Sequence, residues 1–203
     1  NQDFFVRYFL FQKEERKMNY VKKLVGDNIY LAPIRTEDAE QFVEWLNDFS
    51  TTDYIGRSGA IVGLEGEVEF LKKMQAEEAN FSIVRLADDK LIGTVSLNRV
   101  DHIRRIASLG IFIGDKESRE KGYGTEAVRL ILDYGFSYLN LNNIELSCLA
   151  CNERAHRCYL KCGFKEYGRR RQAAFTNGKY YDLIFMDILA EEWTESYIRN
   201  KEV

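Results

Sequence analysis

The hydrophobic pattern of this chain changes its period near the middle, and that change limits the folds open to it. Three consecutive segments rich in β-branched and aromatic residues are joined by short polar turns and predict antiparallel strands: 81–86, 91–100 and 106–113. Residues 122–139 then repeat apolar side chains at helical spacing, and residues 144–149 return to a strand pattern. A strand–helix–strand unit places its two strands parallel. We therefore predict an α+β fold whose mixed sheet is mostly antiparallel, contains one parallel strand pair and is flanked by helices.

Capping residues and turn signals place the other elements. Before the three strands these are a strand 29–34, a helix with Thr36 as N-cap, a loop 50–63 and a helix 64–78. After them come a helix 153–161, which begins after its N-cap Asn152 and ends before Gly163, and a hairpin of strands 164–175 and 180–189 with its turn at Asn177-Gly178. A terminal helix is expected at 190–200. No internal repeat and a single proline, Pro33, favour one domain, which we place at residues 18–203.

Residues 1–17 precede a methionine, Met18, and are interpreted as an N-terminal extension that is a leader or a tag-like segment. The alternative is a helix, because Phe5, Val6, Phe9 and Leu10 recur at helical spacing. We assign this segment no function.

Charge and hydropathy exclude several classes of protein. The net charge is −3, with both signs interspersed, so nothing indicates a nucleic-acid partner. No apolar run reaches the roughly 18 residues that a membrane span needs, and no secretory signal is present. A cytoplasmic location follows, in which the four cysteines are expected to be reduced.

The segment Arg119-Glu-Lys-Gly-Tyr-Gly-Thr125 lies between a predicted strand and a predicted helix. Glycines allow a ligand to approach the main chain, and the free N–H groups of a helix N-terminus attract anions such as a diphosphate. A dinucleotide-binding fingerprint is rejected because antiparallel strands precede the motif, and a Walker loop because no Gly-Lys-Ser/Thr follows. A glycine-rich helix start without a ligand stays open on this motif alone.

A second motif follows one strand later, Asn152-x-x-Ala155-x-x-x-Tyr159-x-x-x-Gly-Phe164. Together the two motifs resemble those of the GNAT N-acetyltransferases, over about residues 28–189. Three further segments are similar to the branch of ribosomal-protein N-terminal (Rim-type) and spermidine acetyltransferases: Leu31-x-Pro-Ile-Arg-x-Glu-Asp-Ala39, Ile92-Gly-Thr-Val-Ser-Leu97 and Gly122-Tyr-Gly-Thr-Glu-Ala127.

The resemblance implies the co-substrate acetyl-CoA and a set of residues that bind it. Main-chain N–H groups of the glycine loop would hold the diphosphate, one strand would pair with the pantetheine arm, Asn152 would hydrogen-bond that arm, and Tyr159 would also protonate the leaving thiolate. The implied set is Gly110, Ile111, Phe112, Ile113, Arg119, Glu120, Lys121, Gly122, Tyr123, Gly124, Thr125, Asn152, Ala155 and Tyr159.

The implied reaction is direct attack of a primary amine on the thioester in a ternary complex. The amine is a protein N-terminus or a small amine such as a polyamine; an antibiotic would differ only as a substrate. Residues 49–63 and 168–180 would form its groove, with Tyr54, Tyr180 and Tyr181 as lining candidates. Glu145 and Ser147 share one side of a strand, but a paired surface charge is the favoured interpretation of Glu145.

A catalytically silent acyl-CoA-binding module is the alternative function, and an amine-dependent thiol-release assay separates the two. Many relatives dimerise, which suggests a homodimer. Cys148, Cys151, Cys158 and Cys162 could supply four sulfurs to a metal, but buried reduced cysteine is a common core residue, so we predict no metal site.

Overall fold

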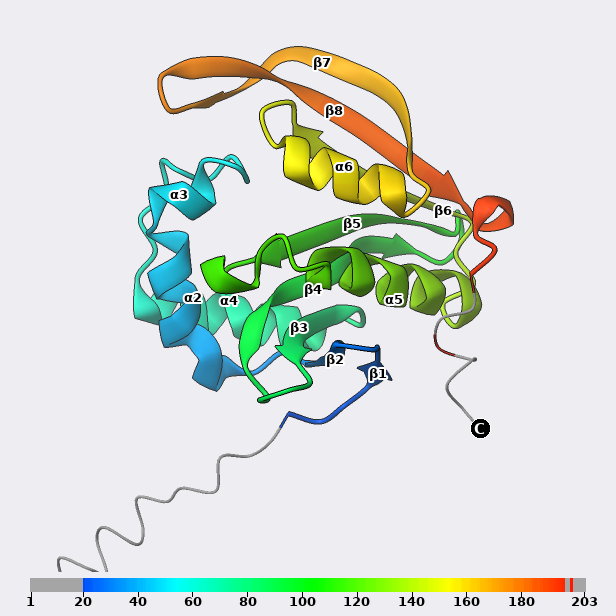
Figure 1. The fold of residues 1–203 in the computed structure, drawn as a ribbon, viewed down its shortest axis with the longest axis horizontal. Helices are drawn as coiled ribbons and strands as arrows, with labels where there is room; N and C mark the ends of the chain where they lie inside the picture. Colours follow the sequence, from blue (N-terminus) through cyan, green and yellow to red (C-terminus); the bar gives the residue numbers. More distant parts are fainter. Residues whose placement is uncertain (1–19, 196–197, 199–203) are drawn as a thin grey trace, which may run out of the picture.

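The sheet contains eight strands in the order β1-β2-β3-β4-β5-β6-β8-β7 (Figure 1). The computed structural model describes residues 20–195 and 198. The strands are β1 (Leu24–Val25), β2 (Ile29–Pro33), β3 (Asn80–Arg85), β4 (Leu91–Asp101), β5 (Ile106–Ile113), β6 (Asn143–Leu149), β7 (Lys165–Thr176) and β8 (Lys179–Leu189).

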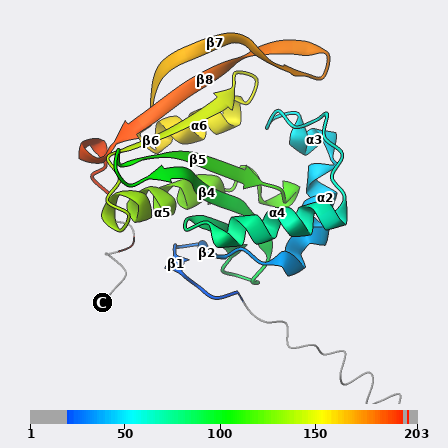
Figure 2. The same ribbon diagram turned by 180° about the vertical axis from the view of Figure 1, so that it is seen from behind.

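Helices cover both faces of this sheet. The α-helices are α2 (Ala39–Leu46), α3 (Phe49–Thr52), α4 (Leu64–Ala76), α5 (Tyr123–Ser137) and α6 (Glu153–Lys161), and 3₁₀ turns occur at Thr36–Asp38, Lys116–Ser118 and Ala190–Glu192. Helix α5 buries its apolar stripe of Ala127, Leu130 and Ile131 in the larger core cluster, to which α6 contributes Tyr159 and its C-cap residue Cys162. Helices α2 and α4 pack on the opposite face, which Figure 2 shows from behind.

The pairing confirms the predicted mixed sheet. Strands β3, β4 and β5 are consecutive and antiparallel, and β6 is parallel to β5. That parallel pairing covers only Ile106↔Asn143 to Ser108↔Glu145. From Leu109 onward β5 keeps its bonds to β4, whereas β6 pairs with β8 along its whole length. The two strands therefore diverge and open a gap in the middle of the sheet.

Three expectations differ from the structure, and one strand was not foreseen. Thr36 is not an N-cap; it begins a 3₁₀ turn and makes no capping side-chain bond. The expected loop 50–63 includes most of helix α3, capped by the Asp48 carboxylate, which accepts the Ser50 N–H at 2.9 Å. Strand β1 was not predicted, since two residues are too short for a periodic pattern.

The terminal helix expected at 190–200 is wrong within the described residues. A 3₁₀ turn, Ala190–Glu192, ends at Trp193. The buried carboxylate of Asp133 accepts the Trp193 Nε1–H at 3.4 Å and the Ile198 main-chain N–H at 2.7 Å. The predicted extension 1–17 and, within the predicted terminal helix, residues 196–197 and 199–200 lie outside the described residues. No helix among those described is long and apolar enough to cross a membrane.

Glu126 connects the first turns of α5 to the β1–β2 turn. Its Oε1 accepts the N–H groups of Asp27 at 2.5 Å and Asn28 at 2.9 Å, and Oε2 accepts the Asn28 Nδ2–H at 3.0 Å. The carboxylate approaches so closely that a Cβ on Gly26 would lie 2.1 Å from Oε1. The side chain thus fixes the start of α5 against the edge of the sheet.

We expect Glu126→Ala to lower the free energy of unfolding by about 2–4 kcal/mol, because the main-chain donors of a partly buried turn lose a charged acceptor. Thermal denaturation followed by circular dichroism measures this as a fall in Tm. Glu117→Ala, a change at an exposed carboxylate that only approaches Lys90 at 3.9 Å, is the control. Equal Tm values for the two variants would contradict the structural role.

Candidate active site

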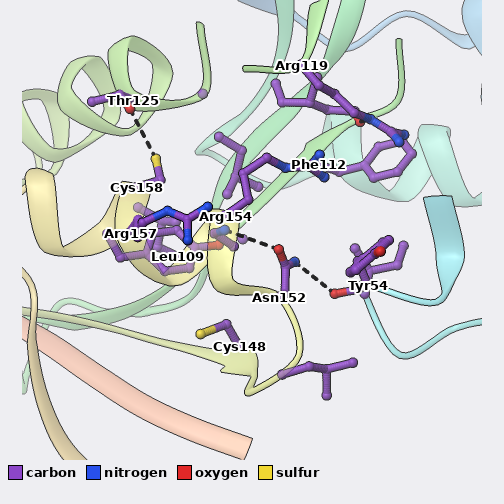
Figure 3. A pocket seen from close by; sticks show the side chains of 18 of the residues that line it. Tyr54, Leu109, Phe112, Arg119, Thr125, Cys148, Asn152, Arg154, Arg157 and Cys158 are labelled. Carbon is purple, nitrogen blue, oxygen red and sulfur yellow. Dashed lines mark hydrogen bonds between the residues drawn. The ribbon is translucent and has the colours of Figure 1, made fainter. Parts of the chain in front are cut away.

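A cavity of about 600 Å³ occupies the place where β5 and β6 diverge. Its walls come from β5, the end of β6, the N-terminus of α5, helix α6 and the segment at and after α3 (Figure 3). All residues of the set implied by the sequence line it except Lys121 and Tyr123. Two motifs 30 residues apart in the chain thus meet at one site.

The N-terminus of α5 opens into this cavity. Gly122 is its N-cap with φ +87°, and Glu120 has φ +63°. The first main-chain bond of the helix runs from the Glu126 N–H to the Gly122 oxygen at 3.0 Å. The N–H groups of the preceding turn consequently have no helical partner, and the helix dipole makes this end electropositive. Successive N–H groups around left-handed residues form a concave anion site.

The hydrogen-bonding groups of Arg119 bind other parts of the protein. Its main-chain N–H donates to the Lys116 oxygen at 3.3 Å. Its guanidinium donates to the oxygens of Ile113 at 3.1 Å and Gly114 at 3.1 Å, and to the Thr51 hydroxyl at 2.8 Å. Burial lowers the pKa of this guanidinium. The side chain ties the end of β5 to α3, and the unpaired N–H groups begin after it.

Strand β5 has one edge free within the gap. Antiparallel pairing to β4 continues to Ile113, so every second residue of β5 directs its main-chain N–H and C=O groups toward β4. The residues between them, from Leu109 to Ile113, direct their main-chain N–H and C=O groups toward the gap, where β6 does not pair with them. An extended ligand can therefore add main-chain hydrogen bonds along this edge.

Asn152 caps α6, as predicted. Its Oδ1 accepts the Ala155 main-chain N–H at 3.1 Å, and its Nδ2 donates to the main-chain oxygen of Tyr54 at 3.0 Å (Figure 3). The side chain therefore holds the segment after α3 against α6. Tyr54 lines the cavity, whereas Tyr180 and Tyr181 do not; Tyr180 lies on Phe175 with ring centroids 4.9 Å apart.

Tyr159 projects from α6 into the same cavity and is 7% exposed. Its ring packs edge-on against Phe164, with centroids 5.9 Å apart. Burial, followed by the neighbouring Cys158, raises the pKa of Tyr159, so its hydroxyl stays protonated at neutral pH. No described residue hydrogen-bonds this hydroxyl, which leaves its proton available to a ligand.

Cys158 also lines the cavity, with its Sγ 3.3 Å from the Thr125 hydroxyl (Figure 3). Hydrogen bonding to the Cys158 sulfur, from Cys162 first and then from Thr125, lowers the pKa of Cys158, whereas burial raises the pKa of Cys148 to about 11. All four cysteines are free thiols, and no cluster of three metal-ligating side chains occurs among the described residues.

We expect iodoacetamide to modify Cys158 first. Because the thiolate is the nucleophile and the pKa of Cys158 is lowered, the rate should rise with pH and reach half its maximum at a lower pH than for an ordinary cysteine. Peptide mapping by mass spectrometry measures the site, and Cys158→Ser is the control that should remove the early modification. Earlier labelling of Cys148 or Cys151 would contradict this assignment.

A second cavity, of about 450 Å³, is lined by β4, β5, β6 and β8. Glu145 and Ser147 both line it, in agreement with their predicted common side of the strand. Ser147 lines the first cavity as well, so the two cavities lie on either side of this residue. The Glu145 carboxylate accepts a hydrogen bond from the Tyr167 hydroxyl at 3.1 Å.

This geometry belongs to a known class of enzyme. A family model described as "Acetyltransferase (GNAT) domain" matches residues 28–165, and the chain belongs to this family. The protein is thus an N-acetyltransferase, an enzyme that transfers an acetyl group to an amine. Among its relatives, the probable N-acetyltransferase YjcK of Bacillus subtilis is 35% identical, over 82% of this chain and 96% of that protein.

Two further proteins similar to this chain are named by the acceptor they act on. The putative ribosomal N-acetyltransferase YdaF of Bacillus subtilis is 34% identical, over 83% of this chain and 95% of that protein. The structure of spermidine N-acetyltransferase from Vibrio cholerae in complex with CoA and spermine matches with a TM-score of 0.75 and 27% identity, over 83% of this chain and 99% of that one.

Proposed function

We propose that the cavity between β5 and β6 binds acetyl-CoA, with its diphosphate on the N-terminal turn of α5 and its pantetheine arm along the free edge of β5. One observation carries this proposal: the unpaired N–H groups, the free strand edge and the Tyr159 hydroxyl all open into the same cavity. Lys121 and Tyr123 contribute main-chain groups to the turn, and Arg119 and Asn152 hold its surroundings in place.

The reaction needs no covalent enzyme intermediate. The amine lone pair attacks the thioester carbonyl carbon, an N–H group of the β5 edge stabilises the oxyanion, and the C–S bond then breaks. The departing thiolate takes the proton of the Tyr159 hydroxyl. The nitrogen releases its proton to solvent through the second cavity, and the Tyr159 phenolate takes a proton back from solvent, so the products are the acetamide and the free CoA thiol.

The acceptor amine reaches the thioester through the second cavity, at Ser147. That cavity has one carboxylate, Glu145, and one guanidinium, Arg99, among its lining side chains. A polyamine carries several positive charges, and this balanced lining does not complement them. The charge pattern therefore favours an acceptor with a single amine, such as a peptide N-terminus, over a polyamine.

The test is an amine panel with acetyl-CoA, in which thiol release is followed and products are identified by mass spectrometry. We expect turnover to be higher with peptides that have a free N-terminus than with spermidine. Higher turnover with spermidine would contradict the acceptor class, and CoA binding without turnover on any amine would contradict the catalytic proposal.

A further inference from the structure

Helix α6 directs three cationic side chains into the first cavity. Arg154, Arg157 and Lys161 are three and four residues apart, so they share one face of the helix, and all three line the cavity. Figure 3 shows Arg154 and Arg157 on the wall formed by α6. Within the described residues the lining has four cations, Arg119 included, and one carboxylate, Glu120. In a chain of net charge −3, this is a local excess of positive charge.

The four cations differ in the hydrogen bonds and ion pairs that they make within the protein. The hydrogen bonds of Arg119 hold the fold together, and Arg154 lies 3.8 Å from the Glu120 carboxylate. Arg157 pairs only with Glu153, one turn away on the same exposed helix surface, at 3.1 Å. The side chain of Lys161 has no ion pair or hydrogen bond with any described residue. Two positive charges are thus available to an anionic ligand.

Their position relative to α5 indicates which anion they meet. Cys158 lies between them in the sequence, and its Sγ is 3.3 Å from the hydroxyl of Thr125, in the first turn of α5. Arg157 and Lys161 therefore flank the contact between α6 and the turn to which we assign the diphosphate. Coenzyme A carries one further phosphate, a monoester on the ribose 3′-oxygen, close to that diphosphate in the molecule.

We propose that Arg157 and Lys161 bind the 3′-phosphate of coenzyme A and so make this enzyme select the complete coenzyme over its dephospho form. The proposal rests on the proposed function, since it takes the diphosphate at α5 as given. A guanidinium and an ammonium suit a phosphate dianion because both donate charge-assisted hydrogen bonds. Both side chains are exposed, so dissolved salt screens the selectivity.

Titration calorimetry with coenzyme A and with dephospho-coenzyme A tests this. We expect the wild-type protein to bind the complete coenzyme at least about tenfold more tightly, the size of effect that one charge-assisted hydrogen bond supplies. The R157A/K161A variant should bind both ligands with nearly the Kd that the wild type shows for the dephospho form. Lys161→Arg should keep the preference, and raising the salt concentration should reduce it.

Lys73→Ala, at an exposed lysine of α4 outside both cavities, is the matched control and should leave the ratio of the two Kd values unchanged. Equal wild-type affinity for the two ligands would overturn the 3′-phosphate assignment and leave the proposed function standing. Binding of neither ligand would overturn the proposed function itself. An equal increase of both Kd values in R157A/K161A would also overturn the assignment. If the double variant fails to fold, the ratio of the two Kd values is measured in the single variants Arg157→Ala and Lys161→Ala.

Discussion

Replacing Tyr159 by phenylalanine should lower kcat by about 100-fold or more while the KM for acetyl-CoA changes little, because a positioned acid contributes at this scale only during bond cleavage. The ring stays buried against Phe164, and only the hydroxyl, which no described residue bonds, is removed. Steady-state kinetics with acetyl-CoA and a good acceptor measures both parameters.

Tyr138→Phe is the matched control, since this tyrosine is half exposed, stacks on Tyr134 and lines neither cavity. It should leave both kinetic parameters at wild-type values. An unchanged kcat in Tyr159→Phe would remove the acid role, and a rise in KM alone would make Tyr159 a binding residue.

The second large effect is expected from Gly124→Asp. A Cβ on Gly124 would lie 3.8 Å from the Ile113 Cγ1, an ordinary contact, so the fold accepts the side chain. A carboxylate in the first turn of a helix is stabilising, by about 0.3–1 kcal/mol. It would also occupy the electropositive turn and repel the diphosphate. At about 5 Å and an effective dielectric constant of about 20, repulsion of one charge pair is about 3 kcal/mol, or roughly a 100-fold loss of affinity.

Gly124→Asp should therefore unfold at or above the wild-type Tm and yet bind coenzyme A at least about 100-fold more weakly. Gly124→Ala separates charge from bulk, and it should keep most of the affinity. Calorimetry and thermal denaturation of the three proteins measure both quantities. Near wild-type affinity in Gly124→Asp would place the diphosphate elsewhere.

The order of elements could be predicted from local patterns. The change of period after Ile113 indicated the parallel pair, and the glycines and Asn152 marked the starts of α5 and α6. These signals are local because caps and turns depend on residues a few positions apart. Together with the family resemblance they also identified 12 of the 25 residues that line the first cavity.

Contacts between distant segments could not be predicted in this way. Glu126 binds a turn about 100 residues earlier in the chain, and Asp133 accepts the main-chain N–H of Ile198, about 65 residues later. The second cavity arises only because β6 leaves β5 after three paired residues, which no pattern within either strand encodes. The spacing of Arg154, Arg157 and Lys161 was visible in the sequence, but their common direction became informative only once the cavity was known.

The central claim is that the main-chain N–H groups of residues 120–125 bind the diphosphate of the coenzyme. The most direct measurement is a titration of ¹⁵N-labelled protein with coenzyme A, followed through the amide resonances. We expect the largest shifts at these six amides, with further shifts along residues 110–113. Saturable binding that leaves the amides of 120–125 unmoved, or no binding at all, would contradict the claim.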